Sequence, residues 1–209
     1  SKLQDVENAV VSGKSKLVAG LVQEALDEGC SAPDILNGMI NAMGIVGERF
    51  KKNEIFVPEM LVAARAMKKG VDVLKPHLAS GSAGVCGKAI IGTVAGDLHD
   101  IGKNLVAMMI ESAGFEVIDL GVDVPVEKFI ETVKANPDVK IVGCSALLTT
   151  TMPALKSTVE ALNSEDFRSH IKVMVGGAPI TQEFADEIGA DAYTPDAASA
   201  AQKAKELVA

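Results

Sequence analysis

The spacing of apolar residues changes near residue 80, and this change limits the folds that the chain can adopt. Before residue 80, apolar residues recur at every third or fourth position, as they do along one face of an α-helix. After it, short runs rich in β-branched residues alternate with segments of helical spacing. The sequence therefore predicts an all-helical region followed by an α/β region.

The first region is expected to form a bundle of four helices. Ser31 is a typical N-cap residue, and Pro33 suits the first turn of the helix that follows. Helices joined by short connections pack antiparallel, which predicts a four-helix bundle domain over residues 1–80. Residues 81–87 are small and rich in glycine, so they are predicted to be a linker. The first two helices are expected near residues 3–12 and 14–28, the third in the segment 31–50, and the fourth along an apolar stripe that runs from Met60 to Leu78.

The second region, residues 88–209, is expected to form a five-stranded parallel sheet with helices on both faces. Strands that alternate with helices indicate βαβ units, and a region of this length suits a flavodoxin-like (Rossmann-like) domain. In such a domain, ligands bind at the carboxyl ends of the strands, near the first and the third. The predicted strands are 88–94, 116–120, 140–144, 172–175 and 191–193, and the predicted helices are 101–113, 125–135, 152–163, 181–188 and 197–208.

Composition argues against several kinds of partner. The formal net charge is −8, no run of Lys or Arg is present, and the chain has no Trp and one Tyr, so nucleic acid is not an expected partner. No apolar run reaches the roughly 20 residues of a membrane span, and the polar start is unlike a secretory signal, so a cytoplasmic protein is expected. The three cysteines lie far apart and predict neither a disulfide framework nor a zinc site.

The segment GDLHDIGKN sets His99 between two aspartates, directly after the first predicted strand. It lacks the glycine spacing of a dinucleotide fingerprint or a phosphate loop, and a receiver domain would need an aspartate where Ser145 stands. The segment alone allows a solvated turn, or a metal ligand whose second ring nitrogen is held by Asp97. A single histidine cannot hold a bare ion, so a metal would bring its own equatorial ligands. Ser145 and the pair Gly176-Gly177, expected at the same edge, favour the ligand.

Together these residues resemble the signature of base-off, His-on corrinoid proteins, the class that includes the cobalamin domain of methionine synthase and the methylamine and methanol corrinoid proteins. The resemblance implies a cobalamin or related corrinoid as cofactor. His99 would replace the cofactor's own base as the lower ligand of cobalt, with Asp97 behind it. Thr151, where methionine synthase has Ser, would complete a proton relay with this pair. The signature residues are Asp97, His99, Gly102, Ser145, Leu147, Gly176 and Gly177.

The same resemblance implies where the detached nucleotide tail of the cofactor would lie. Ser145 would offer its hydroxyl to a ring nitrogen of the tail, and Leu147 would form an apolar wall. The glycine pair, which has no side chains, would leave a passage for the tail. Thr149 and Tyr193 are further expected contacts of the cofactor.

The helical region resembles the cap of methyl-transferring corrinoid proteins, so the resemblance covers nearly the whole chain. The segment GERFKKNEIFVPEMLVAARAM matches the part of the cap that lies over the upper face of the corrin. It implies that Phe50, Val57 and Met60 shield the methyl–cobalt bond. Ordinary helix packing is the competing interpretation for apolar residues of this kind. The cap would have to move aside for partners, with the linker as its hinge.

The resemblance implies a methyl carrier in a three-component system of one-carbon metabolism, as in anaerobic methylotrophic organisms. A substrate-specific methyltransferase would deliver a methyl group to Co(I), and methyl-Co(III) would supply a second methyltransferase that acts on tetrahydrofolate or a thiol. A corrinoid-reactivating protein is a further expected partner, and little activity is expected of the chain alone. The alternatives are the small subunit of an adenosylcobalamin mutase, a cobalamin-dependent sensor or regulator, and an excised cobalamin module of methionine synthase.

Overall fold

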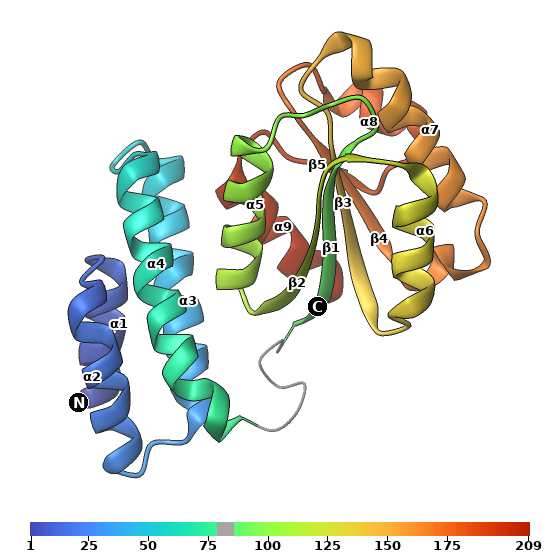
Figure 1. Ribbon diagram of the computed structural model, residues 1–209. Helices are drawn as coiled ribbons and strands as arrows, with labels where there is room; N and C mark the ends of the chain where they lie inside the picture. Colours follow the sequence, from blue (N-terminus) through green and yellow to red (C-terminus); the bar gives the residue numbers. More distant parts are fainter. Residues whose placement is uncertain (79–85) are drawn as a thin grey trace. The chain divides into compact units, whose positions relative to one another are not determined.

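A computed structural model describes residues 1–78 and 86–209, which form two compact units (Figure 1). Helices α1 to α4 form the first unit, and a parallel sheet with its helices forms the second. Residues 81–85 of the predicted linker lie outside the described residues, and Gly87 already begins the first strand. Within the two described ranges, no helix is long and apolar enough to cross a membrane.

The helical unit contains the four predicted helices, each with one buried apolar face. Ser31 caps the third helix as expected, because its side chain accepts a hydrogen bond from the Asp34 amide at 3.2 Å. The helices are α1 (Lys2–Val11), α2 (Ser15–Asp27), α3 (Ala32–Lys51) and α4 (Val57–Leu74). Their fully buried side chains include Val6, Val10, Val18, Val22, Ile35, Met39, Met60 and Leu74.

Helix α4 begins and ends earlier than its apolar stripe predicts. It begins at Val57 because the Phe56 amide donates a hydrogen bond to Glu59 Oε2 at 2.8 Å, which satisfies a backbone group at the helix start. It ends at Leu74, where a 3₁₀ turn over Lys75–His77 contains Pro76. Proline has no amide hydrogen to continue the helical hydrogen bonds, so the periodic residues beyond it are not helical.

The second unit is built on a five-stranded sheet in the order β2-β1-β3-β4-β5, and every pairing is parallel. The predicted flavodoxin-like, Rossmann-like class is therefore confirmed. The strands are β1 (Gly87–Val94), β2 (Phe115–Val124), β3 (Val139–Ser145), β4 (Lys172–Gly176) and β5 (Ala192–Tyr193). The helices are α5 (Ile101–Ser112), α6 (Val126–Ala135), α7 (Met152–Asn163), α8 (Gln182–Ile188) and α9 (Ala197–Val208).

Strand β2 is longer than the sequence predicts. The prediction ended the strand at residue 120, before a segment with Gly121 and Asp123, both typical of turns. The strand instead continues to Val124 through an irregularity, because Ile91 pairs with Asp119 and the next residue of β1 pairs with Gly121. A second shift follows, since Gly92 pairs with Gly121 and Val94 pairs with Val124. The two shifts take up one extra residue of β2 each, and they bring Asp123 to the edge where β1 ends.

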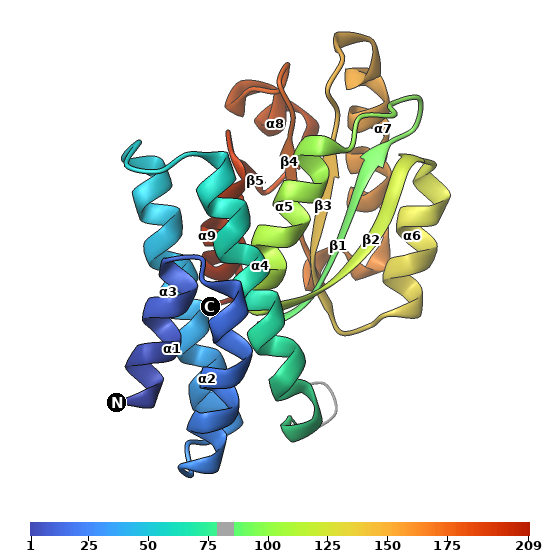
Figure 2. The same cartoon turned by 60° about the vertical axis from the view of Figure 1, so that its left-hand side comes forward.

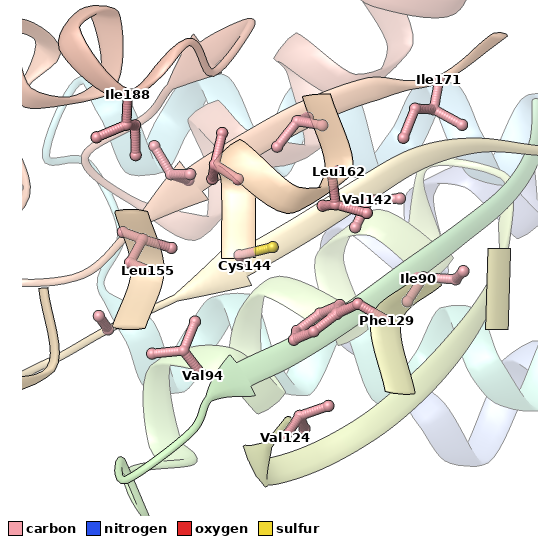
Figure 3. Packing of buried hydrophobic residues seen from close by; sticks show 14 of the residues in the cluster. Ile90, Val94, Val124, Phe129, Val142, Cys144, Leu155, Leu162, Ile171 and Ile188 are labelled. Atoms are coloured by element: carbon pink, nitrogen blue, oxygen red, sulfur yellow. The ribbon is translucent and has the colours of Figure 1, made fainter. Parts of the chain in front are cut away.

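Helices cover both faces of the sheet. Figures 1 and 2 show α5 and α9 on one face and α6 and α7 on the other. A buried apolar cluster lies between the sheet and the second pair, where Phe129 of α6 packs beside β1 (Figure 3). Since all five strands run in one direction, their carboxyl ends share one edge, and the loops after β1, β3 and β4 meet there.

Candidate functional site

His99 lies in the loop that connects β1 to α5, and Asp97 fixes the orientation of its ring. The imidazole Nδ1 lies 2.9 Å from Asp97 Oδ1, and the backbone amide of His99 donates to the same oxygen at 3.1 Å. The imidazole is half-exposed, with 49% of its side-chain surface accessible, whereas the side chain of Asp97 is fully buried. Because Nδ1 faces the carboxylate, Nε2 is the ring nitrogen that can meet a ligand.

The second oxygen of Asp97 is held by the loop after β3. The Leu147 amide donates to Asp97 Oδ2 at 2.7 Å, and the Thr151 hydroxyl donates to it at 2.6 Å. Burial alone would raise the pKa of the Asp97 carboxyl, but the hydrogen bonds from Thr151, Leu147 and His99 outweigh it and hold the pKa well below its ordinary value. Asp97 is therefore a buried anion that stays charged near neutral pH and faces a half-exposed imidazole.

Ser145 ends β3 directly beside the His99 loop. In the parallel pairing of β1 with β3, Thr93 lies opposite Ser145, and the two hydroxyl oxygens are 3.0 Å apart. The Thr93 hydroxyl also donates to the backbone carbonyl of His99 at 2.9 Å. Thr93 is 1% exposed and was not predicted as a site residue. Its signal in the sequence was a lone hydroxyl inside the apolar run AIIGTV.

Asp123 holds the other side of the His99 loop and was also not predicted. Its side chain accepts a hydrogen bond from the Gly96 amide at 2.7 Å, and its own amide donates to the Asp97 carbonyl at 2.9 Å. The φ angle of Asp123 is +50°, a left-handed conformation that is uncommon for residues other than glycine. The loop is thus held from both neighbouring strands, by Asp123 near the end of β2 and by Thr93 with Ser145 between β1 and β3.

Gly176, the last residue of β4, and Gly177, which follows it, have different structural requirements. At Gly177, with φ +131°, a Cβ atom would lie 1.7 Å from the Ala146 carbonyl oxygen, so only glycine lets this loop lie against the loop after β3. At Gly176, a Cβ atom would make only ordinary contact, 3.5 Å from the Thr194 carbonyl oxygen. Packing within the protein accounts for Gly177, and the predicted passage for a tail stays a prediction.

The remaining predicted residues of this unit lie around the same loops. Leu147 is 40% exposed, and Thr149 is exposed in the 3₁₀ turn Thr149–Thr151. Gly102 lies in the first turn of α5, where a Cβ atom would have no neighbour within 4 Å among the described residues. Tyr193 is half-buried at the end of β5, where it pairs with Val175.

Large apolar side chains are exposed on the two loops that meet at His99. Leu98 and Ile101, on either side of His99 in sequence, are 71% and 86% exposed. Leu147 and Leu148 on the loop after β3 are each 40% exposed. Of these four, only Leu147 was predicted as a site residue. Exposed apolar residues beside a polar network are typical of a binding surface, and here they lie close in sequence to His99 or on the loop whose Leu147 amide binds Asp97.

Two family models match the chain, and both are described as a B12 binding domain. One covers residues 87–203 and the other covers residues 3–75. The chain belongs to the B12-binding family. The dimethylamine corrinoid protein of Methanosarcina barkeri is 46% identical over 209 residues, which span 99% of this B12-binding protein and 97% of that relative. The resemblance to methyltransferase corrinoid proteins that the sequence predicted is confirmed.

Solved structures of similar proteins agree with this family. A cobalamin-binding protein from Desulfitobacterium hafniense DCB-2 is 33% identical, with a TM-score of 0.84 over 99% of this chain and 98% of that one. The methanol:cobalamin methyltransferase complex MtaBC from Methanosarcina barkeri contains a chain that is 27% identical, with a TM-score of 0.85 over 99% of this chain and 79% of that one. The cofactor of this B12-binding protein is a cobalamin or a related corrinoid.

The donor set of this B12-binding protein fits such a cofactor. Among residues 1–78 and 86–209, no group of three or more His, Cys, Asp or Glu side chains is placed to hold a metal ion. A site that offers one oriented imidazole can serve only a metal that brings its own equatorial ligands, as cobalt does in a corrin. Cys144 is no alternative ligand, because burial raises the pKa of its thiol to about 12.

The three predicted residues of the helical unit differ in exposure. Val57 is 38% exposed and Phe50 is partly exposed, whereas Met60 is fully buried. Phe56, beside Val57, is 61% exposed and was not predicted. The proposed shielding role of Phe50, Val57 and Met60 stays a prediction, and the burial of Met60 suits a packing role.

Proposed function

We propose that this B12-binding protein is the methyl carrier of a multi-component methyltransferase system. The single observation that supports this most is the half-exposed imidazole of His99, whose ring is held by the buried carboxylate of Asp97. When bound, the corrinoid supplies a cobalt centre that can take up and release a methyl group. The carrier would receive the group from a substrate-specific methyltransferase. A second methyltransferase, acting on tetrahydrofolate or a thiol, would take it away.

His99 would bind cobalt through Nε2, with Asp97 making the imidazole a stronger donor. Hydrogen bonding of a ligating histidine to a carboxylate fixes the ring and raises its basicity. The buried anion of Asp97, 2.9 Å from Nδ1, would also stabilise a proton held at Nε2. Thr151 donates to the far oxygen of the same carboxylate, so it moderates the charge that His99 meets.

The other candidate residues would bind the cofactor and exclude water. Leu98, Ile101 and Leu148 are exposed apolar side chains, and they would contact the flat macrocycle. Ser145, Leu147, Thr149, Gly176, Gly177 and Tyr193 would receive the nucleotide tail, and Gly102 would leave room beside the loop. In the helical domain, which we place at residues 1–80, Phe50, Val57 and Met60 would cover the methyl group. Residues 81–87 would be the hinge between this domain and residues 88–209.

A methylamine is the methyl donor that the relatives favour. Several relatives that match almost this entire chain at 43–46% identity are named dimethylamine corrinoid proteins. The donor itself would be bound by the partner methyltransferase, so the carrier would be specific through its docking surface. Purified dimethylamine, monomethylamine and methanol methyltransferases can be compared for their ability to methylate the reduced holoprotein. The proposal requires fastest methylation with the dimethylamine enzyme, and preference for the methanol enzyme would contradict it.

The absorption spectrum of the protein reconstituted with methylcobalamin tests the role of His99. Wild-type protein should give the spectrum of imidazole-coordinated cobalt, and His99→Ala should give the base-off spectrum. His170→Ala is a matched control, because His170 is exposed in the 3₁₀ turn Asp166–His170. If His99→Ala leaves the spectrum unchanged, His99 is not the lower ligand. If wild-type protein does not retain the cofactor through gel filtration, the proposed function is wrong.

A further inference from the structure

Thr93 connects two parts of the site that stand far apart in the sequence. Its hydroxyl donates to the His99 carbonyl at 2.9 Å and lies 3.0 Å from the Ser145 hydroxyl, across 52 positions of sequence. The connection follows from the register of the sheet, in which Thr93 of β1 pairs with Ser145 of β3. Thr93 is 1% exposed, so water does not readily replace either partner.

The number of protons in this chain of groups fixes the direction of its hydrogen bonds. A hydroxyl has one proton to donate and two lone pairs that accept, whereas a carbonyl can only accept. The Thr93 proton is therefore used on the His99 carbonyl. Ser145 then supplies the proton in its contact with Thr93. Hydrogen bonding runs from Ser145 to Thr93 to His99.

We propose that Thr93 is a positioning residue. It couples the binding of the nucleotide tail at Ser145 to the position of the His99 loop. This rests on the proposed function, in which Ser145 donates to a ring nitrogen of the nucleotide tail. Once the Ser145 proton is used on the tail, the contact between the two hydroxyls persists only if Thr93 turns its own proton to Ser145. The His99 carbonyl then loses its hydrogen bond. The hydrogen bond from Ser145 to the tail and the hydrogen bond from Thr93 to the His99 carbonyl therefore compete, because the two hydroxyls have too few protons to make both and keep their own contact.

Counting hydrogen bonds gives the expected effect of removing the Thr93 hydroxyl. In wild-type protein, the bond gained by the tail is offset by the bond lost at the His99 carbonyl. In Thr93→Val, Ser145 can donate to the tail with nothing lost inside the protein. A hydrogen bond of this kind contributes about 1 kcal/mol net, which is about fivefold in affinity. The tail should therefore contribute about fivefold more to binding in Thr93→Val than in wild type.

The test compares cobalamin with cobinamide, the corrinoid without the nucleotide tail. Both dissociation constants are measured by absorbance titration, and the quantity of interest is the ratio of the cobinamide constant to the cobalamin constant. The ratio should rise about fivefold in Thr93→Val. Thr93→Ala, which is smaller and cannot overpack the strand, should give the same rise. Thr93→Ser keeps the hydroxyl and should restore the wild-type ratio.

Thr158→Val is the matched control. Thr158 is also 1% exposed, and its hydroxyl donates to a backbone carbonyl, that of Ala154, at 2.8 Å within α7. This variant should leave the ratio at the wild-type value. Ser145→Ala should lower the ratio about fivefold when combined with Thr93→Val and by much less in wild-type protein, because in wild type the tail gains no net bond from Ser145.

The outcomes separate this inference from the proposed function. If Thr93→Val and Thr93→Ala weaken both corrinoids by the same factor, Thr93 has a structural role alone and the coupling is overturned. If Ser145→Ala leaves the ratio unchanged in both backgrounds, Ser145 does not contact the tail, and the coupling falls with it. The role of His99 is judged separately by the spectrum of His99→Ala, so either result leaves that conclusion in place.

Discussion

The α/β unit and the helical unit hold their candidate cofactor residues by different forces. In the α/β unit, hydrogen bonds from Leu147, Thr151 and His99 converge on the carboxylate of Asp97, which is fully buried. In the helical unit, the candidates are apolar, and the most buried of them, Met60, is part of the core. A buried charge requires a full set of partners and therefore specifies its surroundings, whereas an apolar side chain requires only volume.

The largest expected effect comes from Asp97→Asn, which keeps the shape but presents an amide to groups that donate. Asparagine keeps only one acceptor oxygen, so either the Leu147 amide and the Thr151 hydroxyl or the backbone amide of His99 would face an NH2 group inside the protein. We expect the free energy of unfolding of the α/β unit to fall by about 4 kcal/mol, as urea denaturation at pH 7 would measure. Asp100→Asn, an exposed change in the same loop, is the control. If both variants lowered the free energy of unfolding equally, the buried hydrogen bonds of Asp97 would not be what stabilises the α/β unit at this site.

The stability that Asp97 provides should depend on pH in one direction. The pKa of this carboxyl is held below its ordinary value in the folded protein, so the folded state favours the anion more than the unfolded chain does. The contribution is fully present above about pH 4, the usual pKa of an unfolded aspartate, and is lost as the pH falls below that. Urea denaturation from pH 7 to pH 3 should show the difference between wild type and Asp97→Asn becoming smaller. A constant difference would contradict the assignment.

A smaller effect is expected from Met60→Ala, which tests whether the helical unit depends on packing at this position. Removing a fully buried methionine leaves a cavity, and the free energy of unfolding should fall by about 3 kcal/mol. Val57→Ala, at a side chain that is 38% exposed, should cost under about 1 kcal/mol. The two are compared by thermal denaturation without cofactor. If Val57→Ala costs as much as Met60→Ala, burial does not separate their roles.

The smallest of these effects is expected from substitutions of Asp123. They test whether hydrogen bonds to side chains other than Asp97 also stabilise the His99 loop. Asp123→Ala removes the acceptor of the Gly96 amide and places alanine at a positive φ angle, so we expect a loss of about 2 kcal/mol. Asp123→Asn keeps an acceptor and tolerates this backbone conformation, so it should cost less than half as much. Urea denaturation measures both. Equal costs would show that the hydrogen bond to Gly96 contributes little.

The sequence predicted the fold class and most of the element positions because periodicity reports which face of each element is buried. It was wrong about the end of α4, where Pro76 interrupts a stripe that continues in apolar spacing. It was also wrong about the end of β2, where Gly121 and Asp123 resemble a turn but belong to an irregular strand. Both errors occurred where backbone geometry overrides the pattern of side chains.

The candidate site was predicted in part, and the omissions have a common cause. Asp97, His99 and Ser145 were predicted because they match the signature of a known family at the edge of the sheet where this fold binds ligands. Thr93 and Asp123 do not stand out, since a threonine in a strand and an aspartate near a turn are ordinary. Their importance comes from hydrogen bonds to the His99 loop, which a single sequence does not display.

The sequence by itself determined that an α/β unit follows four helices and that an Asp-His pair lies after the first strand. It also determined the family, and with it the corrinoid cofactor. Only the tertiary structure decided which groups meet Asp97, that Thr93 lies opposite Ser145, and that packing against Ala146 requires Gly177. The physical reason is the separation in sequence of the residues that are in contact. Periodicity records burial along one element, whereas these contacts join residues 31 to 54 positions apart, and the register between neighbouring strands sets them.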